Sequence, residues 1–356
     1  MTNLDNPKII KKYDKSNMLG LIEALPAQCA DAKVIGAGFR LPEAFRSSYE
    51  SVVATGLGGS AIGADLIRSC IADEAGAPLI VNRNYTLPDF VGSRSLVIAS
   101  SYSGNTEETL SAYKDARRRK ANVIAITSGG RLKALAENDN IPVVIIPPGL
   151  PPRCALGYSS LTLLMVLSKT GLVNNKSRDI DETIEVLKSI RNQNLGPAVP
   201  KAKNFAKQIA AELYKKFPVI YGGYDHTDSV VTRWRGQLSE NAKTLSSGHI
   251  FPEMNHNEIV GWQNPKEVLK NFVVVILRDS GDHPRNSRRM DITKKILEHG
   301  KVKVIEARSS GTGLLARMFS LVYIGDFVSF YLSLLNREDP TPVDRVTYLK
   351  EELSKA

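Results

Sequence analysis

Residues 100–108 read SSYSGNTEE and have the composition of an anion-binding turn. They follow the apolar run Leu96–Ala99 and lead into a helical pattern over Thr106–Arg119, which predicts a strand-to-helix turn. Backbone N–H groups at a helix N-terminus, together with the positive end of the helix dipole, attract a negative group such as a phosphate. Helix capping alone needs one hydroxyl. The hydroxyl residues here are Ser100, Ser101, Ser103 and Thr106. This excess favours anion binding over simple capping, with Ser100 as a buried strand residue.

A glycine-rich segment, Gly56–Gly63 (GLGGSAIG), follows the apolar strand pattern Val52–Thr55. Its glycine spacing departs from the dinucleotide-binding fingerprint, and the next strand lacks the acidic residue that would bind a ribose. We interpret it as a second strand-to-helix turn that offers the Ser60 hydroxyl and nearby N–H groups to a ligand. Turns after parallel strands lie at one edge of a sheet, so Gly58–Ser60 and Ser101–Thr106 can face one pocket.

Arg153 follows two prolines at the end of a further strand pattern, at the same predicted sheet edge. The prolines stiffen the backbone there, and an arginine can bring a fixed positive charge to a substrate or a developing oxyanion. From the local sequence alone, a surface arginine explains the residue equally well.

Glu240 lies in the segment Gln237–Thr244 (QLSENAKT), which has few other acidic residues. A carboxylate held near a substrate carbon can move a proton α to a carbonyl. Without further context, a solvated helical glutamate is the simpler interpretation.

His256 lies in Glu253–Trp262 (EMNHNEIVGW), which combines acids, amides, a histidine and a tryptophan. It is the best histidine candidate for a general acid or base near neutral pH, although a structural hydrogen bond would explain it as well. Its spacing to Glu253 and Glu258 does not fit helical metal ligands, so we expect no metal site.

The elements that must position these residues alternate between apolar strands and helices. The strands expected in the first half are Val52–Thr55, Pro78–Val81, Leu96–Ala99, Val123–Thr127 and Val143–Ile146, and those in the second half are Pro218–Tyr221, Phe272–Leu277 and Val302–Ile305. Continuous apolar strands between helices indicate parallel sheets that are buried on both faces. We therefore predict an α/β fold with two doubly wound domains, each a mainly parallel sheet covered by helices on both faces.

The predicted domain organisation follows the chain in order. It comprises an N-terminal helical extension (1–50), a first domain (51–175), a linker (176–200), a second domain (201–335) and a C-terminal tail with a helix (336–356). The linker is placed where the sequence is polar at both ends of one amphipathic helix.

The chain has 356 residues, enough for two α/β domains, and carries a formal net charge of +10. Basic residues cluster in Lys114–Lys120 and Arg285–Lys295. Neither cluster has interleaved aromatic residues or a reader motif, so we interpret both as solvated helix faces and expect no nucleic-acid partner. The positive field can still attract anionic substrates.

No apolar run approaches twenty residues, and the polar N-terminus lacks the apolar core of a signal peptide. We therefore expect no membrane association and a cytoplasmic location. The three cysteines, Cys29, Cys70 and Cys154, are odd in number and far apart, which indicates neither a disulfide framework nor a metal knuckle.

Taken together, these stretches resemble the sugar isomerase (SIS) domain, and more narrowly the bifunctional phosphoglucose/phosphomannose isomerase family. The strings that carry the resemblance are GLGGSAIG (56–63), SYSGNTEET (101–109), PPRCALGYS (151–159), SENAKT (239–244) and EMNHNEIVGW (253–262). The resemblance covers two SIS-like halves, from about residue 50 to the C-terminus. One departure is Ala61, where many relatives have glycine.

The resemblance implies an enzyme that interconverts glucose 6-phosphate and mannose 6-phosphate with fructose 6-phosphate, in glycolysis and gluconeogenesis. The residues implied to bind the hexose phosphate are Gly59, Ser60, Ser101, Ser103 and Thr106. Glu240 would move a proton between C1 and C2 through a cis-enediol, and Arg153 would stabilise the enediolate. Such proton transfer needs no metal or redox cofactor.

The resemblance also implies a homodimer, because His256 would assist ring opening in the active site of the partner subunit. Lys350, in TYLKEEL, is similar to the C-terminal lysine of the family that also serves ring opening. Thr341 is a candidate for a threonine of the family's pocket.

Three related classes of protein are alternatives. An isomerising glucosamine 6-phosphate synthase would need an N-terminal glutaminase domain with cysteine at position 2, where this chain has Thr2. A non-catalytic sugar-phosphate sensor would bind through the same hydroxyl turns without needing Glu240 and His256 together. Phosphoheptose-type isomerases are usually single SIS units, which the two-half plan disfavours.

Overall fold

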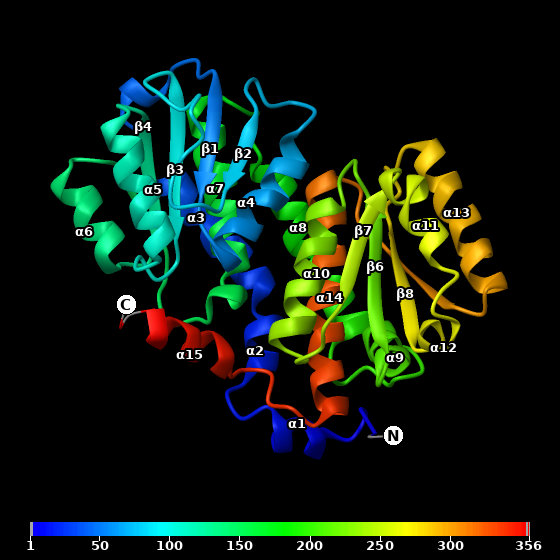
Figure 1. Ribbon diagram of the computed structural model, residues 1–356. Coiled ribbons are helices and arrows are strands. Elements are labelled where there is room, and N and C mark those ends of the chain that lie inside the picture. Colours follow the sequence, from blue (N-terminus) through cyan, green and yellow to red (C-terminus); the bar gives the residue numbers. More distant parts are fainter. Residues whose placement is uncertain (1–2, 354, 356) are drawn as a thin grey trace. The chain divides into compact units, whose positions relative to one another are not determined.

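The computed structural model describes residues 3–353 and residue 355 (Figure 1). The chain divides into two compact units. One comprises Ala24–Lys188 with Ser310–Ser320, and we call it the five-stranded unit after its sheet. The other comprises the segment up to Glu23, Ser189–Ser309 and the segment from Leu321 onward, and we call it the four-stranded unit. The units thus interleave along the chain, whereas the domains expected from the sequence are continuous ranges.

The sheet of the five-stranded unit is entirely parallel. Its strands are β1 (Ser51–Thr55), β2 (Leu79–Asn82), β3 (Ser95–Ser101), β4 (Asn122–Thr127) and β5 (Val143–Ile145). They lie in the order β2-β1-β3-β4-β5. Every residue of β1 and β3 is buried, as continuous apolar runs predict for central strands of a parallel sheet.

Helices cover both faces of this sheet. The helices of this unit are α3 (Leu25–Gly38), α4 (Gly58–Ile71), α5 (Glu107–Arg118), α6 (Gly130–Asn138), α7 (Leu156–Thr170) and α8 (Ser177–Ile190), with short 3-10 turns η1 (Glu43–Phe45) and η2 (Pro152–Cys154). On one face, Val53 and Val97 form a core with Tyr113 of α5 and Leu132 of α6. The alternate strand residues are also buried, and α4 and α7 contact the same strands, so these two helices cover the second face.

The four-stranded unit also has an entirely parallel sheet. Its strands are β6 (Phe217–Gly223), β7 (Ser247–Phe251), β8 (Phe272–Arg278) and β9 (Lys303–Arg308), in the order β7-β6-β8-β9. Its longer helices are α9 (Phe205–Leu213), α10 (Asp228–Glu240), α13 (Pro284–His299), most of α14 (Leu314–Asn336) and α15 (Asp344–Leu353). Its shorter elements are α1 (Pro7–Tyr13), α2 (Met18–Glu23), η3 (Arg191–Leu195), η4 (Glu253–His256), α11 (Glu258–Gly261) and α12 (Lys266–Leu269).

The predicted fold class, two mainly parallel sheets covered by helices, is confirmed. Each strand expected from the sequence coincides with an observed one, and β7 is the strand that the sequence did not predict. Its sequence, SGHIF, mixes glycine and polar residues with few apolar ones, because β7 is an edge strand whose first four residues are only half-buried.

A buried ion pair anchors the beginning of the chain in the four-stranded unit. The side chain of Lys207 is fully buried, and its ammonium donates to the Asp5 carboxylate at 2.9 Å and to the carbonyls of Pro197 and Val199. The hydrogen bond from Lys207 lowers the pKa of Asp5. Nearby, Asn204 caps α9 by accepting a hydrogen bond from the backbone N–H of Lys207.

Helix α14 is the element of the described chain that bears on the expectation of no membrane span. It has 23 residues, and its mean hydropathy over an 18-residue window is 1.6, which is long and apolar enough to cross a membrane. All of that window is buried inside the protein. Burial of this kind is typical of the core helix of a globular protein.

Candidate active site

The two turns rich in glycine and hydroxyl groups follow neighbouring strands of the five-stranded unit. β1 pairs with β3, with Thr55 opposite Ala99, and the chain leaves these strands toward α4 and α5. Strand order reverses at this pair, and the crevice at such a point is the usual ligand site of an open parallel sheet. The backbone N–H of Tyr102 donates to Ser60 Oγ at 3.3 Å. The structure therefore brings the two turns together at one sheet edge.

Glycine at position 56 is required for this close approach. A Cβ atom on Gly56 would lie 2.6 Å from the carbonyl oxygen of Ser100, which belongs to β3. Gly58 adopts a φ of +51°, in the left-handed region, as the chain turns into α4. The glycines of the first turn thus serve backbone packing against the second turn.

The hydroxyls of the second turn are not used to cap α5. Thr106 is the N-cap residue, but its side chain makes no capping hydrogen bond. Instead its Oγ1 accepts from Ser101 Oγ at 2.9 Å, and Ser103 Oγ accepts from the backbone N–H of Asn105. Simple capping therefore does not account for these hydroxyls. Ser100 is buried inside β3, as expected.

Tyr102 fastens the hydroxyl turn to the segment after β5. Its hydroxyl donates to the carbonyl of Pro147 at 2.8 Å and accepts from the N–H of Leu150 at 3.0 Å. Its own carbonyl accepts from the hydroxyl and N–H of Ser128. Burial raises the pKa of the Tyr102 phenol. The sequence pattern alone predicts no role for Tyr102. An aromatic side chain inside a run of small polar residues was the available signal.

Arg153 lies on η2 with only 4% of its surface exposed, so it is not a surface arginine. Its backbone adjoins Gly59, because a Cβ atom on Gly59 would lie 3.3 Å from the Arg153 nitrogen. A guanidinium keeps its charge when buried. The five-stranded unit therefore brings Arg153 to the same edge of the sheet as the two turns.

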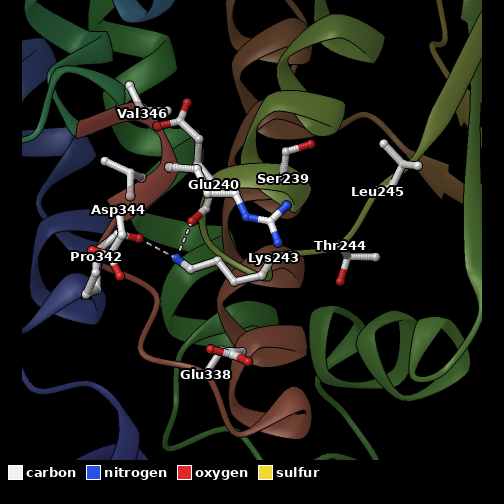
Figure 2. A pocket seen from close by; sticks show the side chains of 11 residues that line it. Ser239, Glu240, Lys243, Thr244, Leu245, Glu338, Pro342, Asp344 and Val346 are labelled. Carbon is white, nitrogen blue, oxygen red and sulfur yellow. Dashed lines mark hydrogen bonds between the residues drawn. The ribbon is translucent and has the colours of Figure 1, made fainter. Parts of the chain in front are cut away.

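Glu240 is the last residue of α10 in the four-stranded unit, and it is half-buried. It lines a cavity of about 570 Å³ (Figure 2). One side of this cavity is the end of α10 and the loop after it, Ser239–Leu245, and the other is the C-terminal segment Pro342–Val346 with Glu338. A general base must border a space that can hold its substrate, and Glu240 borders a cavity large enough for a small one.

His256 and Lys350 do not line the cavity that contains Glu240. His256 is exposed at the end of η4, and Lys350 is exposed on α15. Two residues that follow His256 in the chain are bonded to the sheet. Glu258 accepts a hydrogen bond from the Tyr221 hydroxyl, and Trp262 Nε1 donates to the same hydroxyl at 2.8 Å. Burial and the Glu258 carboxylate raise the pKa of Tyr221. Glu258 and Trp262 therefore hold the segment around His256 against the sheet.

The chain is similar to known proteins along most of its length. Residues 202–353 match the bacterial phospho-glucose isomerase C-terminal SIS domain. A bifunctional phosphoglucose/phosphomannose isomerase from Caldicellulosiruptor bescii is 48% identical over 89% of this chain and 98% of its own. A protein of the same name from Aquifex aeolicus is 37% identical over 86% of this chain and 91% of its own.

Solved structures show the same fold at low sequence identity. A hypothetical protein from Thermus thermophilus has a TM-score of 0.74 at 14% identity, covering 98% of this chain and 92% of that one. A glucose-6-phosphate isomerase like protein from the same organism has a TM-score of 0.62 at 19% identity, over 96% and 99% of the two chains. With relatives this similar over nearly its whole length, the chain belongs to the bifunctional phosphoglucose/phosphomannose isomerase family.

Proposed function

We propose that the protein is an aldose–ketose isomerase that interconverts glucose 6-phosphate and mannose 6-phosphate with fructose 6-phosphate. Membership of the family supports the reaction. The structural observation that carries the proposal is the hydroxyl turn, in which Thr106 occupies the N-cap position of α5 without using its hydroxyl as a cap. These hydroxyls are available to a ligand in a way that helix capping does not explain.

The substrate phosphate binds at the carboxyl edge of β1 and β3. The residues proposed to hold it are Gly59, Ser60, Ser101, Ser103 and Thr106. Two helices, α4 and α5, begin at this edge, and the N–H groups and dipoles of helix N-termini favour a doubly charged anion. These residues bind and orient the substrate and take no part in the chemistry.

Glu240 is the base. Its carboxylate takes the C2 proton of the open-chain aldose, and the electron pair of the C–H bond forms the cis-enediolate. The hydroxyl proton then passes from O2 to O1, and return of the carbon-bound proton to C1 completes the ketose, so the reaction needs no external oxidant or reductant. Arg153 supplies positive charge that stabilises the enediolate. Both C2 epimers are accepted if rotation about the C2–C3 bond presents either face of C2 to Glu240.

His256 and Lys350 serve ring opening. The exposed position of His256 on η4 suits a residue that acts in the active site of a second copy of the chain, so we propose a homodimer in which His256 crosses the interface. The proposed setting is the cytoplasm, in glycolysis and gluconeogenesis.

A coupled assay on the purified protein tests the proposal. Fructose 6-phosphate formation is measured from glucose 6-phosphate and from mannose 6-phosphate, each with excess chelator. We expect turnover of both substrates, unaffected by the chelator. If neither substrate is turned over, the isomerase function is contradicted and a sugar-phosphate sensor is favoured. Loss of turnover on chelation would instead indicate a metal-dependent reaction.

A further inference from the structure

We propose that Lys243 is a positioning residue for Glu240, and this inference rests on the proposed role of Glu240 as the base. Lys243 follows the end of α10 by three residues and borders the same cavity. Its ammonium joins the helix end that carries Glu240 to the segment that leads into α15.

The bonds of the Lys243 ammonium reach both sides of the cavity. Nζ donates to the backbone carbonyl of Glu240 at 2.6 Å and to that of Pro342 at 2.7 Å, as Figure 2 shows. A third, longer bond of 3.3 Å reaches the carbonyl of Pro340. One cation therefore binds three carbonyls that belong to two segments about a hundred residues apart in the chain.

The chemistry of both segments suits a cation. The last carbonyls of a helix have no partner within the helix, and they lie at the negative end of its dipole. Lys243 has a φ of +54°, so the chain reverses direction immediately after α10 and returns the side chain to the helix end. Prolines cannot donate a backbone hydrogen bond, so the backbone of Pro340 and Pro342 offers acceptors alone.

Other bonds fix the same loop to α14 but do not reach the C-terminal segment. Asn241 Nδ2 donates to Ser329 Oγ at 3.0 Å, and Asn336 Nδ2 donates to the Ala242 carbonyl at 2.9 Å and to Thr244 Oγ1 at 3.1 Å. These bonds should keep the loop folded when Lys243 is replaced. The Lys243 bonds to Glu240 and Pro342 therefore contribute to the position of the C-terminal segment against Glu240.

Loss of these bonds should alter the rate of proton transfer rather than substrate affinity. The carboxylate of a general base must lie within hydrogen-bond reach of the carbon-bound proton, and a displacement of about 1 Å can lower the rate by up to a hundredfold. The residues proposed to bind the phosphate belong to the five-stranded unit, whereas Lys243 belongs to the four-stranded unit.

The experiment compares Lys243→Met with Lys216→Met. Lys216 is a matched control, because its ammonium also donates to a backbone carbonyl, that of Lys270 at 3.1 Å. For Lys243→Met we expect kcat to fall about tenfold and KM for fructose 6-phosphate to change by less than about twofold. Lys243→Arg, which keeps the charge and the donors, should recover part of kcat. Lys216→Met should match the wild type.

Amide hydrogen exchange gives a readout that does not depend on activity. Lys243→Met should exchange faster over residues 337–353 than the wild type, with an unchanged melting temperature. If the wild type is active and Lys243→Met has the same kcat and the same amide exchange rates, the proposed role of Lys243 is overturned. A lower melting temperature with proportional loss of active protein would also overturn it in favour of a purely structural role. A wild type without turnover would instead overturn the proposed function.

Discussion

Gly59 packs so tightly against Pro152 that a Cβ atom at position 59 would lie 2.3 Å from the proline carbonyl oxygen. The contact joins the N-terminus of α4 to η2, the turn that carries Arg153. The atom that blocks a side chain is backbone, so it can move only if the whole turn moves. Glycine is therefore needed where the turn after β1 meets the turn that carries Arg153.

Replacing Gly59 with alanine should separate these two turns. We expect KM for glucose 6-phosphate to rise about tenfold and the free energy of unfolding to fall by about 1–3 kcal/mol, as is typical of overpacking. Steady-state kinetics and urea unfolding measure the two effects. Gly38→Ala is the control, because a Cβ atom there meets nothing within 4 Å. An unchanged KM in Gly59→Ala would contradict the proposed phosphate site.

Thr106→Val tests whether the hydroxyl serves a ligand or the helix. Thr106 makes no capping hydrogen bond, so the variant should lose less stability than the roughly 1 kcal/mol typical of a lost cap. Its KM should rise about tenfold, because a hydroxyl proposed to bind the phosphate is gone. Asn204→Ala provides the opposite case, since Asn204 caps α9 through its side chain. That variant should lose stability and keep its KM.

Glu240→Gln should abolish most of the turnover while leaving the protein folded. Removal of a general base typically lowers kcat by about 10²- to 10⁴-fold, and KM should change little. Exchange of the C2 hydrogen with solvent deuterium, followed by NMR, should slow in parallel. Glu338→Gln is the matched control, because Glu338 lines the same cavity. Equal activity of the Glu240 and Glu338 variants would mean that another residue is the base.

Asp282→Asn should stabilise the protein above pH 6. Burial, with the nearby carboxylates of Asp279 and Asp225, raises the pKa of Asp282 to about 6. The folded-state pKa lies above the unfolded value of 3.8, so ionisation of Asp282 lowers the free energy of unfolding. This loss is small below about pH 4 and is nearly complete above about pH 6.

The wild type should therefore lose about 2 kcal/mol relative to Asp282→Asn as the pH rises from 4 to 7. Urea unfolding of both proteins at pH 4, 5, 6 and 7 measures this difference. A constant difference across the four pH values would show that Asp282 titrates normally.

The fold was predictable because its central strands are continuous apolar runs, such as Leu96–Ala99 within β3. β7 was not, since an edge strand needs few apolar residues. The hydroxyl turns were equally visible, because small polar residues directly follow apolar strands. Their use as phosphate ligands stays a prediction.

Tyr102 and Lys243 could not be identified from the sequence as positioning groups. The Tyr102 hydroxyl binds Pro147, and the Lys243 ammonium binds Pro342, in each case a backbone carbonyl far along the chain. A carbonyl is present at every residue, so no residue type at the partner position reveals the bond. Such contacts become apparent only once the fold has brought the two segments together.

The pair of Asp5 and Lys207 sets a limit on how the protein can be shortened for expression. A variant that begins after Asp5 would leave a fully buried ammonium with carbonyl partners and no carboxylate. Removing one partner of a buried pair is strongly destabilising, by about 3–5 kcal/mol when both partners are buried and by less here, where Asp5 is partly exposed. An affinity tag is therefore better joined ahead of an intact N-terminal segment than substituted for it.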